Sequence, residues 1–211
     1  EPKELGDDLD DIVRAQGEPF GSTSIYAGYR MFQMIREAGI VVNLDGQGAD
    51  ELLAGYDGYP SDAVHSLLDR HCYLEVFRFL KRWAQWSGRS YRSAFVMLLQ
   101  VLVPDALRGL AYRVMGRTPT PIWLNVDYLS EHGVRLCPPT RRKSSRDTHG
   151  RRLAGALRES LTGRRLARLL RHGDRNSMHW SVESRVPFLT IEMAEFLLRL
   201  PESYLLGPDG E

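Results

Sequence analysis

The stretch that decides the fold is IVVNLDGQGADELLAGYDGY, residues Ile40 to Tyr59. Residues 40–44 are short, apolar and mostly β-branched, which is typical of a strand buried on both faces in a parallel sheet. Residues 45–48, Asp-Gly-Gln-Gly, predict a loop, because glycines allow a tight turn and a close approach of a ligand to the backbone. Residues 49–53 are good helix formers with two acids in the first turn, where the helix dipole favours carboxylates.

A strand, a Gly-rich loop and a helix in this order form a common site for phosphate-bearing ligands in open α/β sheets. A plain turn followed by a helix start explains the same residues, because a lone Gly-rich loop is a weak signal. The local pattern therefore predicts the structure of the junction and leaves its function open.

The composition is that of a soluble globular protein, with 211 residues, 43% apolar and 26% charged. The 28 Lys and Arg nearly balance the 27 Asp and Glu, and the net charge of +1 argues against a dedicated nucleic-acid binder. Cys72 and Cys137 lack metal-ligand spacing, which favours free thiols in a reducing cytoplasm. No run is long and apolar enough to predict a membrane span.

Helical periodicity dominates the rest of the chain, and 40–44 is the one clear strand. We expect helices at 5–15, from a cap at 22–24 to Gly39, at 63–88, at 91–115 with a break at Pro104, at 151–170, at 175–184 and at 193–200. Residues 116–150 are rich in Pro, Ser and Arg, with 123–131 as a short interruption, and they predict a loop that is mobile in part.

Two segments together resemble the asparagine synthase family. LDGQGADELLAGY, residues 44–56, is similar to the family loop S-G-[ED]-G-x-D-E-x-F-G-G-Y, and DRNSMHWSVESRVPFL, residues 174–189, is similar to R-x-x-M-x-x-x-[IVL]-E-x-R-x-P-F-L-D. Weaker agreement in GEPFGSTS, residues 17–24, and EFLLRLPESYLL, residues 195–206, extends the resemblance over most of the chain. Residues 63–151 are the least distinctive part.

The resemblance implies an α/β fold of the adenine nucleotide alpha hydrolase-like, ATP pyrophosphatase type, although this chain itself is expected to be mostly α-helical. Such domains use ATP and Mg²⁺ to adenylate a carboxylate, release pyrophosphate, and let ammonia attack the activated carbonyl. The parent would be an AMP- and pyrophosphate-forming carbon–nitrogen ligase of asparagine biosynthesis. Its ammonia would come from glutamine through a glutaminase domain, and a homo-oligomer is one option for its assembly.

The family's functional residues carry over to a few positions. Asp45, Gly46 and Gln47 match the loop that approaches ATP, and Asp50 matches the acid that helps to hold Mg²⁺ and pyrophosphate. Glu183 matches an acid that relatives use as part of a catalytic base, with its partner position occupied here by Gln47.

Further positions allow two interpretations. Arg185 belongs either to the site or to an ion pair that holds the two matched segments together. Ser22, Thr23 and Ser24 match a loop near the phosphates, yet hydroxyl side chains before a helix are more often caps.

The sequence also departs from the family pattern. It contains no Ser-Gly-Gly-x-Asp-Ser pyrophosphate loop, no glutaminase domain and no catalytic lysine after the last helix, so residues 1–211 are expected to be an incomplete and inactive part of a synthetase. Gln47 replaces a glutamate, Asp45 a serine and Thr190 an aspartate. Glutamine cannot act as a general base, so that role would pass to Glu183 or the incoming amine. The acyl substrate could be aspartate or a specialised analogue.

Two alternatives of a different kind stay open. The arginine-rich stretch 135–171 could make the chain a phosphate- or nucleic-acid-binding module, although the near-neutral net charge favours an ordinary solvated surface. The chain could also be a domain that kept the fold and lost catalysis, with Gln47 as the trace of that loss.

Overall fold

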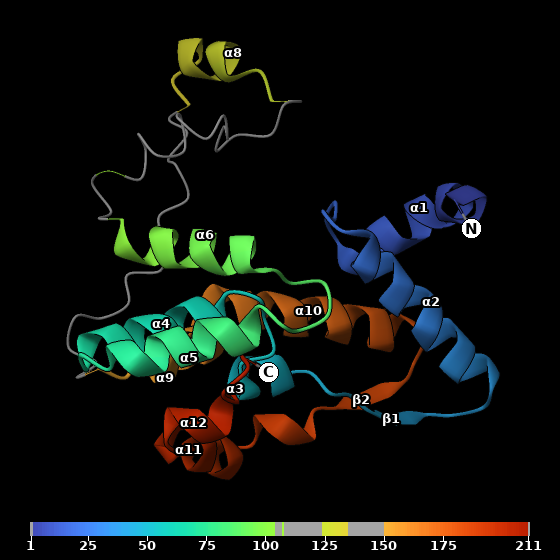
Figure 1. Cartoon of the computed structure of the whole chain (residues 1–211). Coiled ribbons are helices and arrows are strands. Elements are labelled where there is room, and N and C mark those ends of the chain that lie inside the picture. Colours follow the sequence, from blue (N-terminus) through green and yellow to red (C-terminus); the bar gives the residue numbers. More distant parts are fainter. Residues whose placement is uncertain (1, 104–106, 108–123, 135–149, 211) are drawn as a thin grey trace. The chain divides into compact units, whose positions relative to one another are not determined.

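The computed structural model describes residues 2–103, 107, 124–134 and 150–210 (Figure 1). These residues are mostly helical and form one sheet of two short parallel strands. The chain divides into two compact units, the first made of residues 1–56 and 157–205 and the second of residues 57–156 and 206–211.

Three helices build one side of the first unit: α1 (Pro2–Gln16), α2 (Thr23–Glu37) and α10 (Arg164–His179). They pack on one another and bury Ile12 of α1 with Phe32 of α2. The helices expected at 5–15 and between the 22–24 cap and Gly39 are confirmed. In each helix, apolar residues recur every three or four positions and form one face, which another helix covers.

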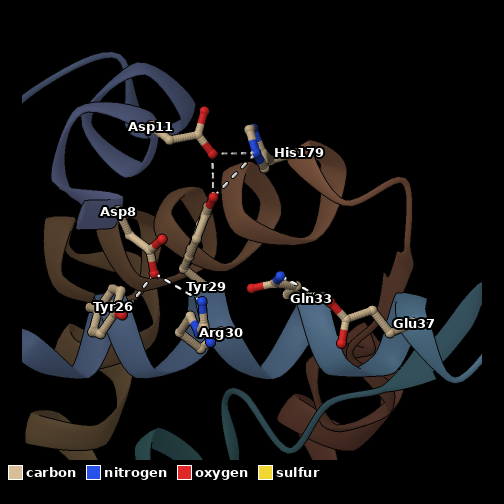
Figure 2. Close-up of polar contacts among 8 residues, drawn as sticks. All are labelled: Asp8, Asp11, Tyr26, Tyr29, Arg30, Gln33, Glu37 and His179. Carbon is tan, nitrogen blue, oxygen red and sulfur yellow. Dashed lines mark hydrogen bonds and ion pairs between the residues drawn. The ribbon is translucent and has the colours of Figure 1, made fainter. Parts of the chain in front are cut away.

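Carboxylates of α1 reach the tyrosines of α2, as Figure 2 shows. The Tyr26 hydroxyl donates to Asp8 Oδ2 at 2.8 Å, and the hydroxyl of buried Tyr29 donates to Asp11. His179 Nε2 of α10 lies 3.0 Å from the same Asp11 oxygen. Burial raises the pKa of Tyr29, and the hydrogen bond to Asp11 raises it further. The Asp11 side chain thus joins all three helices.

The sheet pairs β1 (Val42–Leu44) with β2 (Glu183–Arg185) in parallel, with Val42 opposite Glu183 and Leu44 opposite Arg185. The expected strand at 40–44 is confirmed in position, but the prediction that it is buried on both faces is wrong for this chain. Val42 is 40% exposed and Leu44 72% exposed. A sheet of two three-residue strands offers other elements little area to pack on, so its faces stay largely uncovered.

Strand β2 corrects the helix expected at 175–184. Helix α10 ends at His179, Ser181 takes a left-handed conformation with φ 53°, and the next residues enter the strand. Its sequence, Glu-Ser-Arg, has no β-branched or aromatic residue that would predict a strand. The hydrogen bonds to β1 therefore decide its conformation.

The helix expected at 151–170 is also wrong, because it is two helices. Helix α9 (Arg152–Thr162) ends before Gly163, which is extended at the N-cap of α10. A Cβ at Gly163 would lie 2.5 Å from the carbonyl oxygen of Glu159, so the chain needs glycine to leave α9 there. The first unit is completed by α3 (Ala49–Leu53), the 3-10 turn η1 (Pro187–Leu189), α11 (Ile191–Arg199) and α12 (Glu202–Leu205). Helix α11 confirms the expected final helix.

The second unit contains α4 (Tyr59–Asp69), α5 (Tyr73–Trp83), α6 (Tyr91–Leu102) and α8 (Val126–Glu131). The first three pack together around Val64, Phe79 and Met97. The single helix expected at 63–88 is wrong, because the chain breaks at His71, where φ is 58°. Helix α6 ends before Pro104, as expected from the missing proline N–H.

Parts of two expectations lie outside the described residues. These are residues 104–106 and 108–115 of the expected helix at 91–115, and residues 116–123 and 135–149 of the expected mobile loop, of which the latter contain Cys137. Cys72 carries a free thiol, as expected. Within 2–103, 107, 124–134 and 150–210, no helix has the length and apolar character needed to cross a membrane.

Candidate functional site

The strand pairing brings the two matched segments together. Because β1 and β2 are parallel, the loop after β1 and η1 after β2 leave the same end of the sheet (Figure 1). The Asp45 N–H donates to the carbonyl oxygen of Arg185 at 2.7 Å, which extends the pairing into the loop. The two segments, more than a hundred residues apart in the chain, thus meet at one edge.

Gly48 shows how close the two segments approach. It has φ 92°, and a Cβ there would lie 2.2 Å from Leu189 Cδ2 and 2.5 Å from Leu189 Cγ. Gly46 differs, since a Cβ there would meet nothing within 4 Å. The fold therefore requires glycine at 48 and sets no such requirement at 46.

The side chain of Asp45 shapes the loop that carries Gln47. Asp45 Oδ1 accepts a hydrogen bond from the Gln47 N–H at 3.2 Å, the pattern of an Asx turn. Both residues are half-buried, whereas Gly46 between them is exposed. The loop thus offers the Gly46 backbone to solvent.

Asp50 and Glu51 are neighbours in α3 with opposite environments. Asp50 is exposed, while Glu51 is 1% exposed. Glu51 Oε1 accepts a hydrogen bond from the Tyr56 hydroxyl at 2.8 Å. Burial raises the pKa of Tyr56, and the hydrogen bond to Glu51 raises it further. The sequence singled out Asp50 and missed the role of Glu51.

Arg165, in the first turn of α10, joins the hydrogen-bonded pair of Glu51 and Tyr56. Its guanidinium lies over the Tyr56 ring, 3.9 Å from the ring centre, in cation–π geometry. Sequence reasoning missed it, because Arg165 lies in the arginine-rich stretch with no mark that sets it apart. The sequence offered one signal for the buried Glu51: it precedes the apolar residues Leu52 and Leu53 in α3.

Glu183 and Arg185 are both exposed, and they form an ion pair within β2. Arg185 Nε lies 2.7 Å from Glu183 Oε1. Arg185 thus ion-pairs along its own strand, and the backbone carries the contact between the two segments. Glu183 is opposite Val42, at the beginning of the strand pair, whereas Gln47 follows its end.

The hydroxyl residues before α2 form a cap. Ser22 is the N-cap of α2, and its side chain accepts a hydrogen bond from the Ser24 N–H at 3.2 Å. Ser22, Thr23 and Ser24 are all exposed. The Ser22 oxygen satisfies one of the free N–H groups of the first turn, which is the capping interpretation of this segment.

Several arginines of the 135–171 stretch bind side chains of their own unit. In the second unit Arg152 Nη2 donates to Asp69 Oδ1 at 2.7 Å. In the first, Arg171 pairs with Glu18, and Arg165 lies on Tyr56. Residues 135–149 of the stretch lie outside the described residues. These internal partners weaken the alternative of a phosphate- or nucleic-acid-binding surface.

The described part of the chain holds no cluster of three or more His, Cys, Asp or Glu side chains that could bind a metal ion by itself. Mg²⁺ differs from transition metals in this respect, because it commonly uses one or two carboxylates together with waters and substrate phosphates. The exposed carboxyl group of Asp50 fits such a shared site.

The fold and site define a chain whose paired strands carry an acidic, Gly-rich loop at their common end. Comparison with protein-family models matched the asparagine synthase family over residues 1–211, the whole chain. The chain therefore belongs to the asparagine synthase family, which indicates a ligase similar to asparagine synthetase. No match was found among curated proteins or among solved structures.

Proposed function

We propose that this chain forms part of an ATP pyrophosphatase-type synthetase domain that adenylates a carboxylate and transfers ammonia or another amine to it. The observation that supports this proposal most strongly is the register of β1 and β2, which sets the two family segments side by side. A chain that merely contained two similar segments would have no reason to pair them in this way.

In this proposal the loop at 45–48 binds ATP through its backbone, with exposed Gly46 closest to the nucleotide. Asp50 holds Mg²⁺ together with the phosphates. When bound there, Mg²⁺ would supply positive charge beside the pyrophosphate that leaves. The loop and Asp50 would act by positioning the α-phosphate for in-line attack by the substrate carboxylate.

Glu183 is the proposed base that accepts a proton from the attacking ammonia or amine. Gln47 has no carboxylate to share this task, so it would orient a substrate by hydrogen bonds. Gln47, Asp45 and Thr190 all depart from the family pattern, and the acyl substrate is accordingly proposed to be aspartate or a specialised analogue of it.

The pyrophosphate loop and the catalytic lysine are proposed to come from other segments of the same synthetase, since the 211 residues contain no Ser-Gly-Gly-x-Asp-Ser. Ammonia would come from glutamine through a glutaminase domain, in a cytoplasmic enzyme. The isolated chain is then expected to release no pyrophosphate above background, and release by the purified chain would overturn this part of the proposal.

The test uses the intact synthetase with ATP, Mg²⁺, aspartate and either glutamine or ammonia, and measures AMP, pyrophosphate and asparagine. Asp50→Asn is expected to abolish AMP formation, whereas Asp57→Asn, a change of another exposed carboxylate nearby, should leave it intact. Glu183→Gln is expected to block amide formation more than ATP binding. Equal AMP formation by the Asp50→Asn variant and wild type would refute the role of Asp50, and efficient asparagine synthesis would exclude a specialised substrate.

A further inference from the structure

The turn that follows Asp50 is closed by two hydrogen bonds. Helix α3 ends at Leu53, its C-cap residue Ala54 is left-handed with φ 59°, and the Gly55 N–H donates to the carbonyl oxygen of Asp50 at 3.1 Å. One residue further on, the Tyr56 hydroxyl donates to Glu51 Oε1 at 2.8 Å. The backbone bond and the side-chain bond fold residues 50–56 into one closed turn.

This turn determines where the Asp50 carboxyl group lies. A Cβ at Gly55 would be 2.2 Å from Asp50 Oδ1 and 3.2 Å from Asp50 Cα, so the carboxyl group lies directly against the Gly55 backbone. A shift of the Gly55 backbone would therefore change the contact that orients the Asp50 carboxyl group. Asp50 itself is exposed, and neighbouring atoms of the turn therefore have to orient it.

Glu51 and Tyr56 have the burial and contacts needed to fix Gly55. Glu51 is 1% exposed, so its carboxyl group is held in the interior. Tyr56 follows Gly55 directly, and Arg165 covers its ring from α10. The Tyr56 ring is thus fixed at its hydroxyl by Glu51 and on one face by Arg165, which leaves little freedom to the residue before it.

We propose that the hydrogen bond between Tyr56 and Glu51 positions the Asp50 carboxyl group for a divalent cation bound together with pyrophosphate. Glu51 and Tyr56 act through Asp50 and are positioning residues. This inference rests on the proposed role of Asp50 as a ligand of Mg²⁺. It predicts that cation affinity depends on a hydroxyl group that does not itself contact the cation.

The test measures the binding of Mn²⁺, an oxygen-binding substitute for Mg²⁺, to the intact synthetase in the presence of inorganic pyrophosphate, by electron paramagnetic resonance. Tyr56→Phe removes the hydroxyl and keeps the ring under Arg165. We expect Mn²⁺ affinity to fall about tenfold or more, because the loss of a group that orients a metal ligand typically weakens metal binding by about that factor. Asp50→Asn should weaken binding at least as strongly.

A matched control exists in the same unit. Tyr26→Phe removes a tyrosine–carboxylate hydrogen bond that is also 2.8 Å long, between Tyr26 and Asp8 (Figure 2). It should leave Mn²⁺ affinity at the wild-type value. An equal loss of affinity in Tyr26→Phe and Tyr56→Phe would mean that general stability controls binding, and it would overturn the inference.

Substitution of Glu51 provides a rescue experiment. Glu51→Gln keeps an oxygen that accepts from Tyr56 and should bind Mn²⁺ nearly as well as wild type, whereas Glu51→Leu removes the acceptor and should weaken binding. Hydrogen exchange of the Gly55 amide supplies a readout without metal, since exchange should accelerate in Tyr56→Phe and Glu51→Leu and stay slow in Glu51→Gln.

The outcomes separate this inference from the proposed function. Wild-type affinity in Tyr56→Phe, with a clear loss in Asp50→Asn, overturns the positioning role alone. Absence of Mn²⁺ binding by the wild-type synthetase, or equal binding by its Asp50→Asn variant, overturns the metal site of the proposed function and the inference with it. Loss of affinity in Tyr56→Phe and Glu51→Leu, with rescue by Glu51→Gln, supports the positioning role.

Discussion

Replacement of Gly48 by alanine tests the contact between the two family segments. The positive φ of 92° disfavours an L residue, and the new Cβ would lie 2.2 Å from Leu189 Cδ2. The left-handed conformation costs about 1–2 kcal/mol and overpacking about 1–3 kcal/mol, while the lower entropy of the unfolded chain returns about 0.5–1 kcal/mol. We therefore expect the free energy of unfolding to fall by about 1–4.5 kcal/mol.

The assay is urea denaturation followed by circular dichroism, with Gly46→Ala as the matched control in the same loop. A Cβ at Gly46 meets nothing within 4 Å, so this control should lose no stability and should gain at most about 1 kcal/mol from the lower entropy of the unfolded chain. Leu189→Ala combined with Gly48→Ala should recover the overpacking part, about 1–3 kcal/mol, as a coupling in a double-mutant cycle. Equal stability of the Gly48→Ala and Gly46→Ala variants would refute the close approach.

Three further predictions concern the first unit. Ser22→Ala should lower the free energy of unfolding by about 1 kcal/mol through loss of the cap on α2, and Thr23→Ala should cost less; the reverse order in thermal melts would contradict the cap. Arg185→Ala should leave the melting temperature nearly unchanged, because its ion pair with Glu183 is exposed, and a large drop would reveal a partner beyond that strand. Burial, reinforced by Arg171, lowers the pKa of His172 from its usual 6.5, so protons bind the unfolded chain more readily and stability should fall as the pH drops below about 6.5. His172→Asn should reduce this loss of stability at low pH, as measured by urea denaturation at several pH values. An unchanged dependence of stability on pH in this variant would contradict the role of His172.

Local chemistry was sufficient for several elements of this chain. Caps and periodicity predicted α1, α2 and α11, since a helix makes its hydrogen bonds within its own segment. The strand, loop and helix at 40–53 were predicted for the same kind of reason, from β-branched residues, glycines and helix formers. The errors at 63–88 and 151–170 came from apolar periodicity that continues across the breaks at His71 and Gly163.

The tertiary structure alone decided the features that depend on distant partners. Glu183 to Arg185 forms a strand only because β1 supplies its hydrogen bonds, and the residues themselves do not favour one. Asp50 and Glu51 are adjacent carboxylates of similar chemistry, yet the fold exposes the first and buries the second against Tyr56. The sequence by itself determined which two segments resemble the family's motifs. Their pairing and the burial of single side chains followed from contacts between residues far apart in the chain, which no local pattern records.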